Sequence, residues 1–186
     1  MATNTNKVKY NIKNVHYAVK NEEGYDTPVA WPGAVSISLE QQGEINTFYA
    51  DGVKYYVSAT NGGYEGDLET ALVPDQFRED VLGEQKDANG VLIETSSAST
   101  VEFALGFQID GDFCPTLFWF YNCTATRPSV SSQTNEDTIT PQTDTLTVSC
   151  SADDEGLIRA KTTSDSYSQV SATWFNEVYK KAEGAG

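Results

Sequence analysis

This chain of 186 residues contains a single histidine and none of the familiar catalytic motifs. His16 is the single histidine and has no Cys, Asp or second His beside it, so an ordinary strand histidine is a simpler interpretation than a catalytic base. No G-x-S-x-G elbow, P-loop or H-E-x-x-H motif occurs. An enzyme would need several titratable groups in one cleft. The sequence therefore favours a protein that is not an enzyme and that uses no cofactor.

Cysteines and long apolar runs are also scarce. The three cysteines, Cys114, Cys123 and Cys150, are an odd number for a disulfide framework. The longest apolar block, Leu117 to Tyr121, has the length of a strand, whereas a membrane-spanning helix needs about 18 apolar residues or more. The first residues contain no apolar core of a signal peptide. We therefore expect synthesis in the cytoplasm without secretion, reduced thiols and no contact with a membrane.

Basic residues are few. Twelve Lys and Arg stand against 27 Asp and Glu, which gives a formal net charge of −15. Such a surface repels nucleic acid phosphates and anionic lipid, which argues against a conventional DNA-binding protein. The acidic clusters at residues 110–112 and 153–155 lack the twelve-residue spacing of an EF-hand. Solvated turns are the simpler interpretation of both clusters, so we expect no metal site.

What the chain does contain is a series of short segments with apolar residues at every second position, the pattern of half-buried strands. Asp51-Gly52 predicts a hairpin between two of them, because a type I′ turn needs two residues that tolerate positive φ. The predicted strands are 34–40, 47–50, 53–57, 64–72, 101–109, 116–126, 145–149 and 157–162. Because long helical crossovers are absent, we expect a mainly antiparallel sheet.

One of these strands, at 116–126, carries large apolar residues on both faces. Phe118 and Phe120 alternate with Leu117, Trp119 and Tyr121. A strand that is covered on both sides has this composition, so we expect a layer of protein on each face.

Two helices are predicted. Residues 74–82 form the clearer one: Pro74 suits the first helical position, Gly83 suits the end, and Phe77, Val81 and Leu82 share the face that packs on the sheet. The apolar residues between 170 and 179 are also at helical spacing and favour a last short helix. Together these elements predict one mainly β domain over 1–186.

Three segments have little apolar content. They are an N-terminal arm at about 1–9, a polar loop or hairpin tip at about 40–46, and a Ser/Thr-rich loop at about 129–144. Segments of this kind can fold on contact with a partner, although solvent-facing loops without a partner have the same composition.

The aromatic residues outside these segments admit two interpretations. Six of them could line a sugar-binding face, but core packing explains most of them more simply. They are Trp31, Tyr55, Tyr56, Tyr64, Trp119 and Trp174.

Four stretches of the sequence resemble the major tail protein family of bacteriophages with long non-contractile tails. They are NKVKYNIKNVHYAV near the start, residues 48–83, residues 120–149, and WFNEVY at 174–179. They cover nearly the whole chain in order, and the strings are long and unusual.

The resemblance implies a tail-tube fold, in which two antiparallel sheets pack as a sandwich or partial barrel with a helix on the flank. It also implies a structural virion protein whose subunits form rings of six, stacked into a tube through which DNA passes during ejection. The partners would be other copies of the chain, the tape-measure protein, and the tail-tip and tail-terminator proteins. DNA would cross the tube without specific binding.

Within that expectation, two sets of residues are candidates for tube functions. Glu65, Asp67 and Glu69 alternate on one strand face and are candidates for the channel wall, although a solvated outer face would look the same. Gln41, Gln42, Gly43 and Glu44 are candidates for an inter-ring contact. The alternative function is a β-sandwich module that binds a glycan or a protein, which would not form tubes as its concentration rises.

Overall fold

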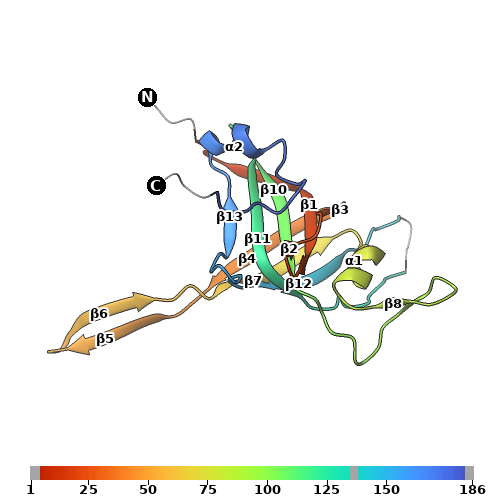
Figure 1. Cartoon of the computed structure of the whole chain (residues 1–186), viewed down its shortest axis with the longest axis horizontal. Helices are drawn as coiled ribbons and strands as arrows, with labels where there is room; N and C mark the ends of the chain where they lie inside the picture. The colour runs from red at the N-terminus through yellow and green to blue at the C-terminus, as the bar shows by residue number, and fades with distance from the viewer. Residues whose placement is uncertain (1–4, 135–137, 183–186) are drawn as a thin grey trace.

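The computed structural model describes residues 5–134 and 138–182, and it is mainly β with two short helices (Figure 1). The strands are β1 Lys9–Asn21, β2 Gly24–Tyr25, β3 Val29–Trp31, β4 Ala34–Gln42, β5 Ile45–Ala50, β6 Val53–Ala59, β7 Gly63–Thr70, β8 Gln85–Lys86, β9 Leu92–Ile93, β10 Phe103–Gly111, β11 Thr116–Ala125, β12 Asp144–Cys150 and β13 Arg159–Lys161. The helices are α1 Asp75–Asp80 and α2 Ser164–Val170.

The main sheet is antiparallel and strongly curled. Its strand order is β2-β1-β10-β11-β12-β7-β4, with β3 paired to β1 and β13 paired to β11. The sheet curls until β1, the second strand in this order, lies near β4, the last strand, without pairing to it. The sheet is therefore a partial barrel that is not closed, and the predicted fold class is confirmed.

The main core lies inside the curl and is closed on one side by α1. Inward residues of β1, β7, β10, β11 and β12 meet Phe77, Val81 and Leu82, all three of which are fully buried. The Tyr17 hydroxyl of β1 donates a hydrogen bond to the Asp80 carboxylate at 2.9 Å, which ties the helix to the sheet.

The residues around α1 differ slightly from the prediction. Pro74 is the N-cap with extended backbone angles and not the first helical residue, and the regular helix ends at Asp80. Gly83 has a φ of +73°, the left-handed conformation that the prediction required of it. The chain therefore turns back after Leu82, and Val81 and Leu82 reach the core from the turn that follows the helix.

A second core lies on the opposite face of β10 and β11, under the C-terminal segment. It contains Leu117, Trp119 and Tyr121 of β11 together with Trp174 and Val178. Phe118 and Phe120, on the other face of β11, pack in or against the main core. The prediction that β11 is covered on both sides is confirmed.

The C-terminal helix was predicted for 170–179, and that position is wrong. The helix occupies Ser164–Val170, begun by a capping box between Thr163 and Ser166, and turns follow it. Backbone carbonyls that a helix would need are used elsewhere: Trp174 O accepts from the Trp119 indole at 2.9 Å and Tyr179 O accepts from the Tyr121 hydroxyl at 2.6 Å. The apolar residues at 170–179 therefore pack on the sheet although the segment is not a helix.

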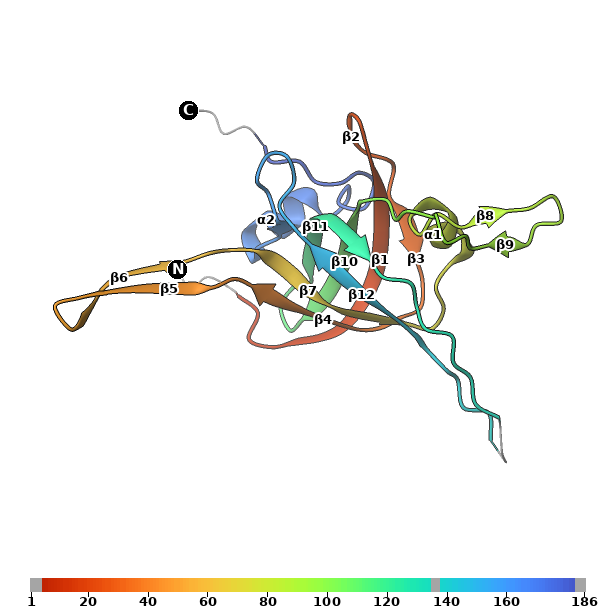
Figure 2. The ribbon, with the colours of Figure 1, turned by 90° about the horizontal axis from the view of Figure 1, so that it is seen from below.

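Several parts of the chain project from this body (Figure 2). The β5–β6 hairpin extends far to one side, while β8 and β9 form a short arm near α1. The chain between β11 and β12 forms a third arm, and the described part of residues 127–143 contains no helix or strand. Of the expected loop at 129–144, residues 135–137 lie outside the described residues, and Asp144 already belongs to β12.

Candidate assembly surfaces

The hairpin β5–β6 projects from the body of the molecule as a continuation of the β4–β7 ribbon (Figure 2). Asp51 and Gly52 have φ values of +52° and +75°, as the predicted type I′ turn requires. The two strands are paired only with each other in the part of the chain that the structure describes. A two-stranded hairpin alone is marginally stable in water, so this segment lacks the support that other strands have.

Large apolar side chains are exposed on this hairpin. The exposed fractions are 74% for Ile45, 61% for Phe48, 63% for Tyr56 and 53% for Val57. Large apolar side chains that gather exposed on one element are typical of an interaction site. The interpretation of the aromatics as core residues is right for Trp31, Trp119 and Trp174 and wrong for Tyr55 and Tyr56, which are both exposed.

The hairpin also differs from the rest of the molecule in charge. Between Ile45 and Ala59 it contains one acidic and one basic residue, Asp51 and Lys54, whereas the whole chain has a formal net charge of −15. Copies of a strongly acidic protein repel each other. A neutral hairpin can therefore approach another copy with little repulsion.

The predicted loop at 40–46 is largely strand. Gln41 and Gln42 end β4 and pair with Tyr64 and Gly63, and only Gly43 and Glu44 lie between β4 and β5. Thr60 closes this joint, because its N–H donates to Glu44 O at 3.0 Å. The four candidate contact residues are therefore the root of the hairpin and not a separate loop.

Gly43 is required at this root. A Cβ atom there would lie 2.1 Å from Thr60 O, closer than real contacts allow. The chain can cross from β4 into β5 beside Thr60 only because this position has no side chain.

The second candidate surface is the outer face of β4, β7 and β12. Glu65, Asp67 and Glu69 all point away from the core, while Leu68 between them is buried. Their register partners on β4 and β12 are polar or acidic, and none is basic. These partners are Ser36, Ser38, Glu40, Thr145, Thr147 and Ser149. The structure thus extends the acidic strand face of the prediction into a wider polar and acidic sheet face.

Hydroxyl groups hold the carboxylates of this acidic sheet face in place. Thr143 Oγ1 donates to Glu69 at 2.7 Å, Ser36 Oγ donates to Glu69 at 2.9 Å, and Thr147 Oγ1 donates to Asp67 at 2.8 Å. The hydrogen bonds from Thr143 and Ser36 lower the pKa of Glu69 below its ordinary value. Glu69 is therefore ionised at neutral pH and fixed in direction.

Among the described residues, β4 and the first half of β1 each have an open edge beside the gap in the partial barrel. β4 pairs only with β7, and the first half of β1, Lys9 to Asn14, pairs on one side with β10 and has no strand on its other side within the described residues. Open edges present unpaired N–H and C=O groups that another chain can pair with. These edges flank the opening of the partial barrel.

The described part of the N-terminal arm is attached to the turn between β10 and β11. The Asn6 side chain donates to Cys114 O at 2.7 Å and accepts from the N–H groups of Phe113 and Cys114. Asp112 accepts from Lys7 N–H at 2.7 Å. The expected flexible arm at 1–9 thus has fixed contacts from Asn6 onward, and residues 1–4 lie outside the described residues.

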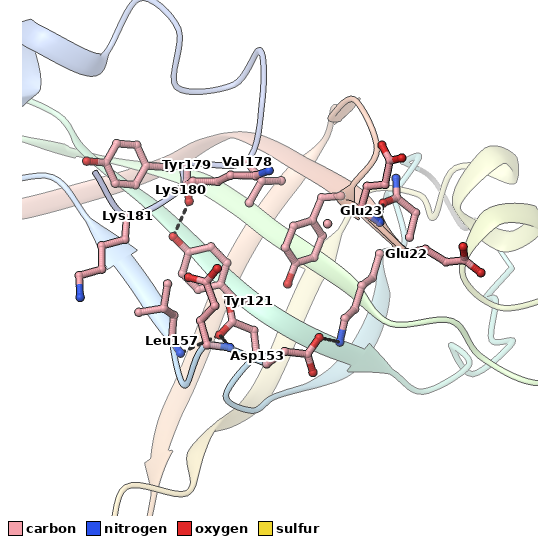
Figure 3. A pocket seen from close by; sticks show the side chains of 15 residues that line it. Glu22, Glu23, Tyr121, Asp153, Leu157, Val178, Tyr179, Lys180 and Lys181 are labelled. Atoms are coloured by element: carbon pink, nitrogen blue, oxygen red, sulfur yellow. Dashed lines mark hydrogen bonds and ion pairs between the residues drawn. The ribbon is translucent and has the colours of Figure 1, made fainter. Parts of the chain in front are cut away.

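A hollow lies between the β1–β2 turn, the loop after β12 and the C-terminal segment (Figure 3). Its polar groups bind one another: Lys20 Nζ lies 3.5 Å from the Asp154 carboxylate, and the Tyr121 hydroxyl donates to Tyr179 O. Burial raises the pKa of both Tyr25 and Tyr121. Within the described lining, no nucleophile is paired with a base.

His16 stacks on Phe175 with ring centroids 4.5 Å apart, which makes it a packing residue. No group of three His, Cys, Asp or Glu side chains is placed to hold a metal ion within residues 5–134 and 138–182. None of the helices in that part of the chain is both long and apolar enough to cross a membrane.

Comparison with known proteins gives one family. A family model described as "Phage tail tube protein" matches residues 14–181. No curated protein matches the sequence significantly. Among solved structures, a chain of the anti-feeding prophage (AFP) baseplate, determined by cryo-EM with six-fold symmetry, aligns with a TM-score of 0.45 and 14% identity over 87% of this chain and 97% of that chain. A likeness that distant carries no argument.

Proposed function

This chain belongs to the phage tail tube protein family, and from that premise we propose that it assembles into rings of six that stack as the tube of a long, non-contractile tail. Phage DNA passes through this tube during ejection. The observation that carries the proposal is the projecting hairpin, whose apolar residues are exposed in the single chain and whose charge is neutral. Such a surface fits a subunit that is completed by its own copies.

Two kinds of contact would build the tube. The open edges of β4 and β1 suit strand pairing around a ring, because head-to-tail pairing closes when the rotation permits it. The hairpin, with its root at Gln41 to Glu44, suits the contact between rings because it extends beyond the body. Tail-tip, tail-terminator and tape-measure proteins are the further partners of such a tube.

Electron microscopy of the purified protein over a concentration series, with added salt, tests this function. Salt shortens the range of repulsion between acidic subunits to below about 8–10 Å, so we expect rings or hollow tubes of uniform width at high concentration and salt. A protein that stays monomeric throughout, and that also fails to enter tails in a phage assembly extract, would contradict the proposal and favour a simple binding module.

The acidic sheet face of β4, β7 and β12 is the proposed channel wall. Carboxylates there repel phosphates, so DNA slides without binding. Replacement of Glu65, Asp67 and Glu69 by Lys should leave tubes intact and slow DNA ejection, because phosphates would then bind the wall.

A matched control for this channel variant changes the same charge elsewhere, with Glu22, Glu23 and Glu155 replaced by Lys. These three line the hollow of Figure 3, and none of them belongs to β4, β7 or β12. Normal ejection by phages that carry the channel variant would refute the assignment of this face. Slow ejection in both variants would point to total charge instead.

A further inference from the structure

The β5–β6 hairpin has two apolar faces. Thr47 pairs with Val57, and the next pair, Phe48 with Tyr56, lies on the opposite face because side chains alternate along a strand. Ile45 shares the face of Val57. Each face therefore carries at least two large exposed apolar residues.

Two strands of the body, β7 and β11, show how the covering of a strand depends on whether one or both of its faces are apolar. β7 has one polar and one apolar face, and only the apolar face is covered. β11 has large apolar residues on both faces, and a core lies on each side of it. By its composition the hairpin resembles β11, yet neither of its faces is covered in the single chain.

We propose that each hairpin is inserted between two other copies of the chain, so that every such contact joins three subunits. This inference rests on the proposed self-assembly and adds which surfaces are used. The neutral charge of the hairpin favours copies of this acidic chain as the occupants on both sides. A contact that needs three chains also makes assembly steeply dependent on concentration.

Photo-crosslinking in assembled material tests the insertion. A benzophenone amino acid is placed at Tyr56 in one variant and at Val57 in another, since these neighbours lie on opposite faces. We expect both positions to crosslink between subunits and to different tryptic peptides. Crosslinks from one position only, or from both positions to the same peptide, would overturn the three-chain contact.

Paired substitutions give an independent readout. I45S/V57S reduces one apolar face and F48S/Y56S reduces the other, and N46S/S58T is the control because this pair is already polar. We expect each face variant to lower tube yield at least tenfold while its melting temperature stays near that of the wild type. Tubes at wild-type yield from either face variant would refute the two-sided contact. A wild type that forms no tubes at all would instead refute the proposed function.

A second inference concerns two buried cysteines. Cys123 of β11 lies directly opposite Cys150 of β12, both are free, and both are buried. Ser151 N–H donates to Asn122 O and Thr126 N–H donates to Thr147 O, so Cys123 and Cys150 form a non-hydrogen-bonded pair. In such pairs the Cα atoms lie about 4.5 Å apart, within the range of disulfides.

We infer that Cys123 and Cys150 are a site of disulfide formation when the protein meets a small disulfide oxidant. In the balanced step, the two thiols and one oxidised glutathione give the intrachain disulfide and two reduced glutathiones. Burial raises the pKa of the Cys123 thiol, so the reaction requires β12 to open and is slow. The bond would close the loop that contains the 127–143 arm.

Mass spectrometry of the C114S variant tests this site, since that variant retains only the facing pair. After long incubation with oxidised glutathione, we expect a loss of about two mass units and, after digestion with a protease that cleaves before Asp, a link between the peptides 112–136 and 144–152. The bond should also raise the melting temperature relative to the reduced protein. Glutathione adducts, or unmodified thiols after the wild type has been modified at Cys114, would overturn the inference.

Discussion

The ribbon formed by β4 to β7 has two halves that differ in how their apolar side chains are arranged and covered. In the body half, β4 and β7 alternate apolar residues toward the core with Ser, Asp and Glu toward the outside. In the projecting half, β5 and β6 carry apolar residues on both faces, and neither face is covered by another part of the chain. The two halves also differ in pairing, because β7 has a strand on each side whereas β5 and β6 pair only with each other in the described residues. This difference marks where folding of one chain ends and where, on our proposal, assembly begins.

Excision of the hairpin should have the largest effect. Replacing Ile45 to Ala59 by Asp-Gly leaves Glu44 and Thr60 joined by a two-residue turn, which suits strands already hydrogen-bonded there. We expect tube formation to be lost, while the melting temperature changes by only a few degrees. Microscopy and calorimetry measure the two effects. The control D51N keeps a type I′ turn and should form tubes normally; tubes from the excision variant would refute the role of the hairpin.

A pair of truncations compares the two halves in the isolated subunit. Leu68 of the body half is 1% exposed, so Leu68→Ala should lower the free energy of unfolding by roughly 2–5 kcal/mol through lost burial and a cavity. Tyr56→Ala in the hairpin should change it by no more than about 0.5 kcal/mol. Urea unfolding of monomers measures both. Equal losses would mean that the hairpin is supported by its own chain.

Replacing a glycine by alanine should also have different effects on stability in the two halves. A Cβ atom on Gly66 would lie 1.7 Å from Ser38 O, so Gly66→Ala should push β4 from β7 and destabilise the body by about 1–3 kcal/mol. Gly52 at the hairpin tip has open space around it and only a positive φ, so Gly52→Ala should strain the turn alone. Urea unfolding detects the first change and amide exchange in β5 and β6 the second. Global destabilisation by Gly52→Ala would contradict this distinction.

The smallest expected effect is electrostatic and belongs to the body half. The lowered pKa of Glu69 means that its contribution to stability is present above about pH 4.5 and is lost as the pH falls through the lower folded-state value. Removing the donors with S36A/T143A should raise this pKa toward 4.5, as an NMR titration would show. The control T147A removes a hydrogen bond to Asp67 and should leave Glu69 unchanged. An unchanged pKa in the double variant would exclude these hydroxyls as the cause.

Much of the local structure could be predicted because it depends on neighbours in the sequence. The Asp51-Gly52 turn follows from residues that tolerate positive φ, and the strands follow from alternation. The two-sided covering of β11 follows from large residues on both faces. The helix expected at 170–179 failed because carbonyls of that segment bond side chains of β11, and sequence spacing does not contain those partners.

The candidate surfaces were predicted less completely. The alternation of Glu65, Asp67 and Glu69 was visible, but their polar neighbours on β4 and β12 depend on pairing between distant segments. Core packing was expected to explain most of the six candidate aromatics, and Tyr55 and Tyr56 are exceptions because both are exposed. The apolar residues on both hairpin faces were the available signal, since β11 shows the same pattern.

The sequence by itself determined the strand pattern, the turn chemistry, the acidic charge and the family, because these depend on residue types and their order. Only the tertiary structure decided which apolar faces are covered. Burial depends on what the other segments can reach, and the curled sheet, α1 and the C-terminal segment cover β11 but leave β5 and β6 bare. Large apolar residues on both faces therefore have different outcomes: those of β11 are covered within the chain, and those of β5 and β6 are, on our proposal, left for a partner.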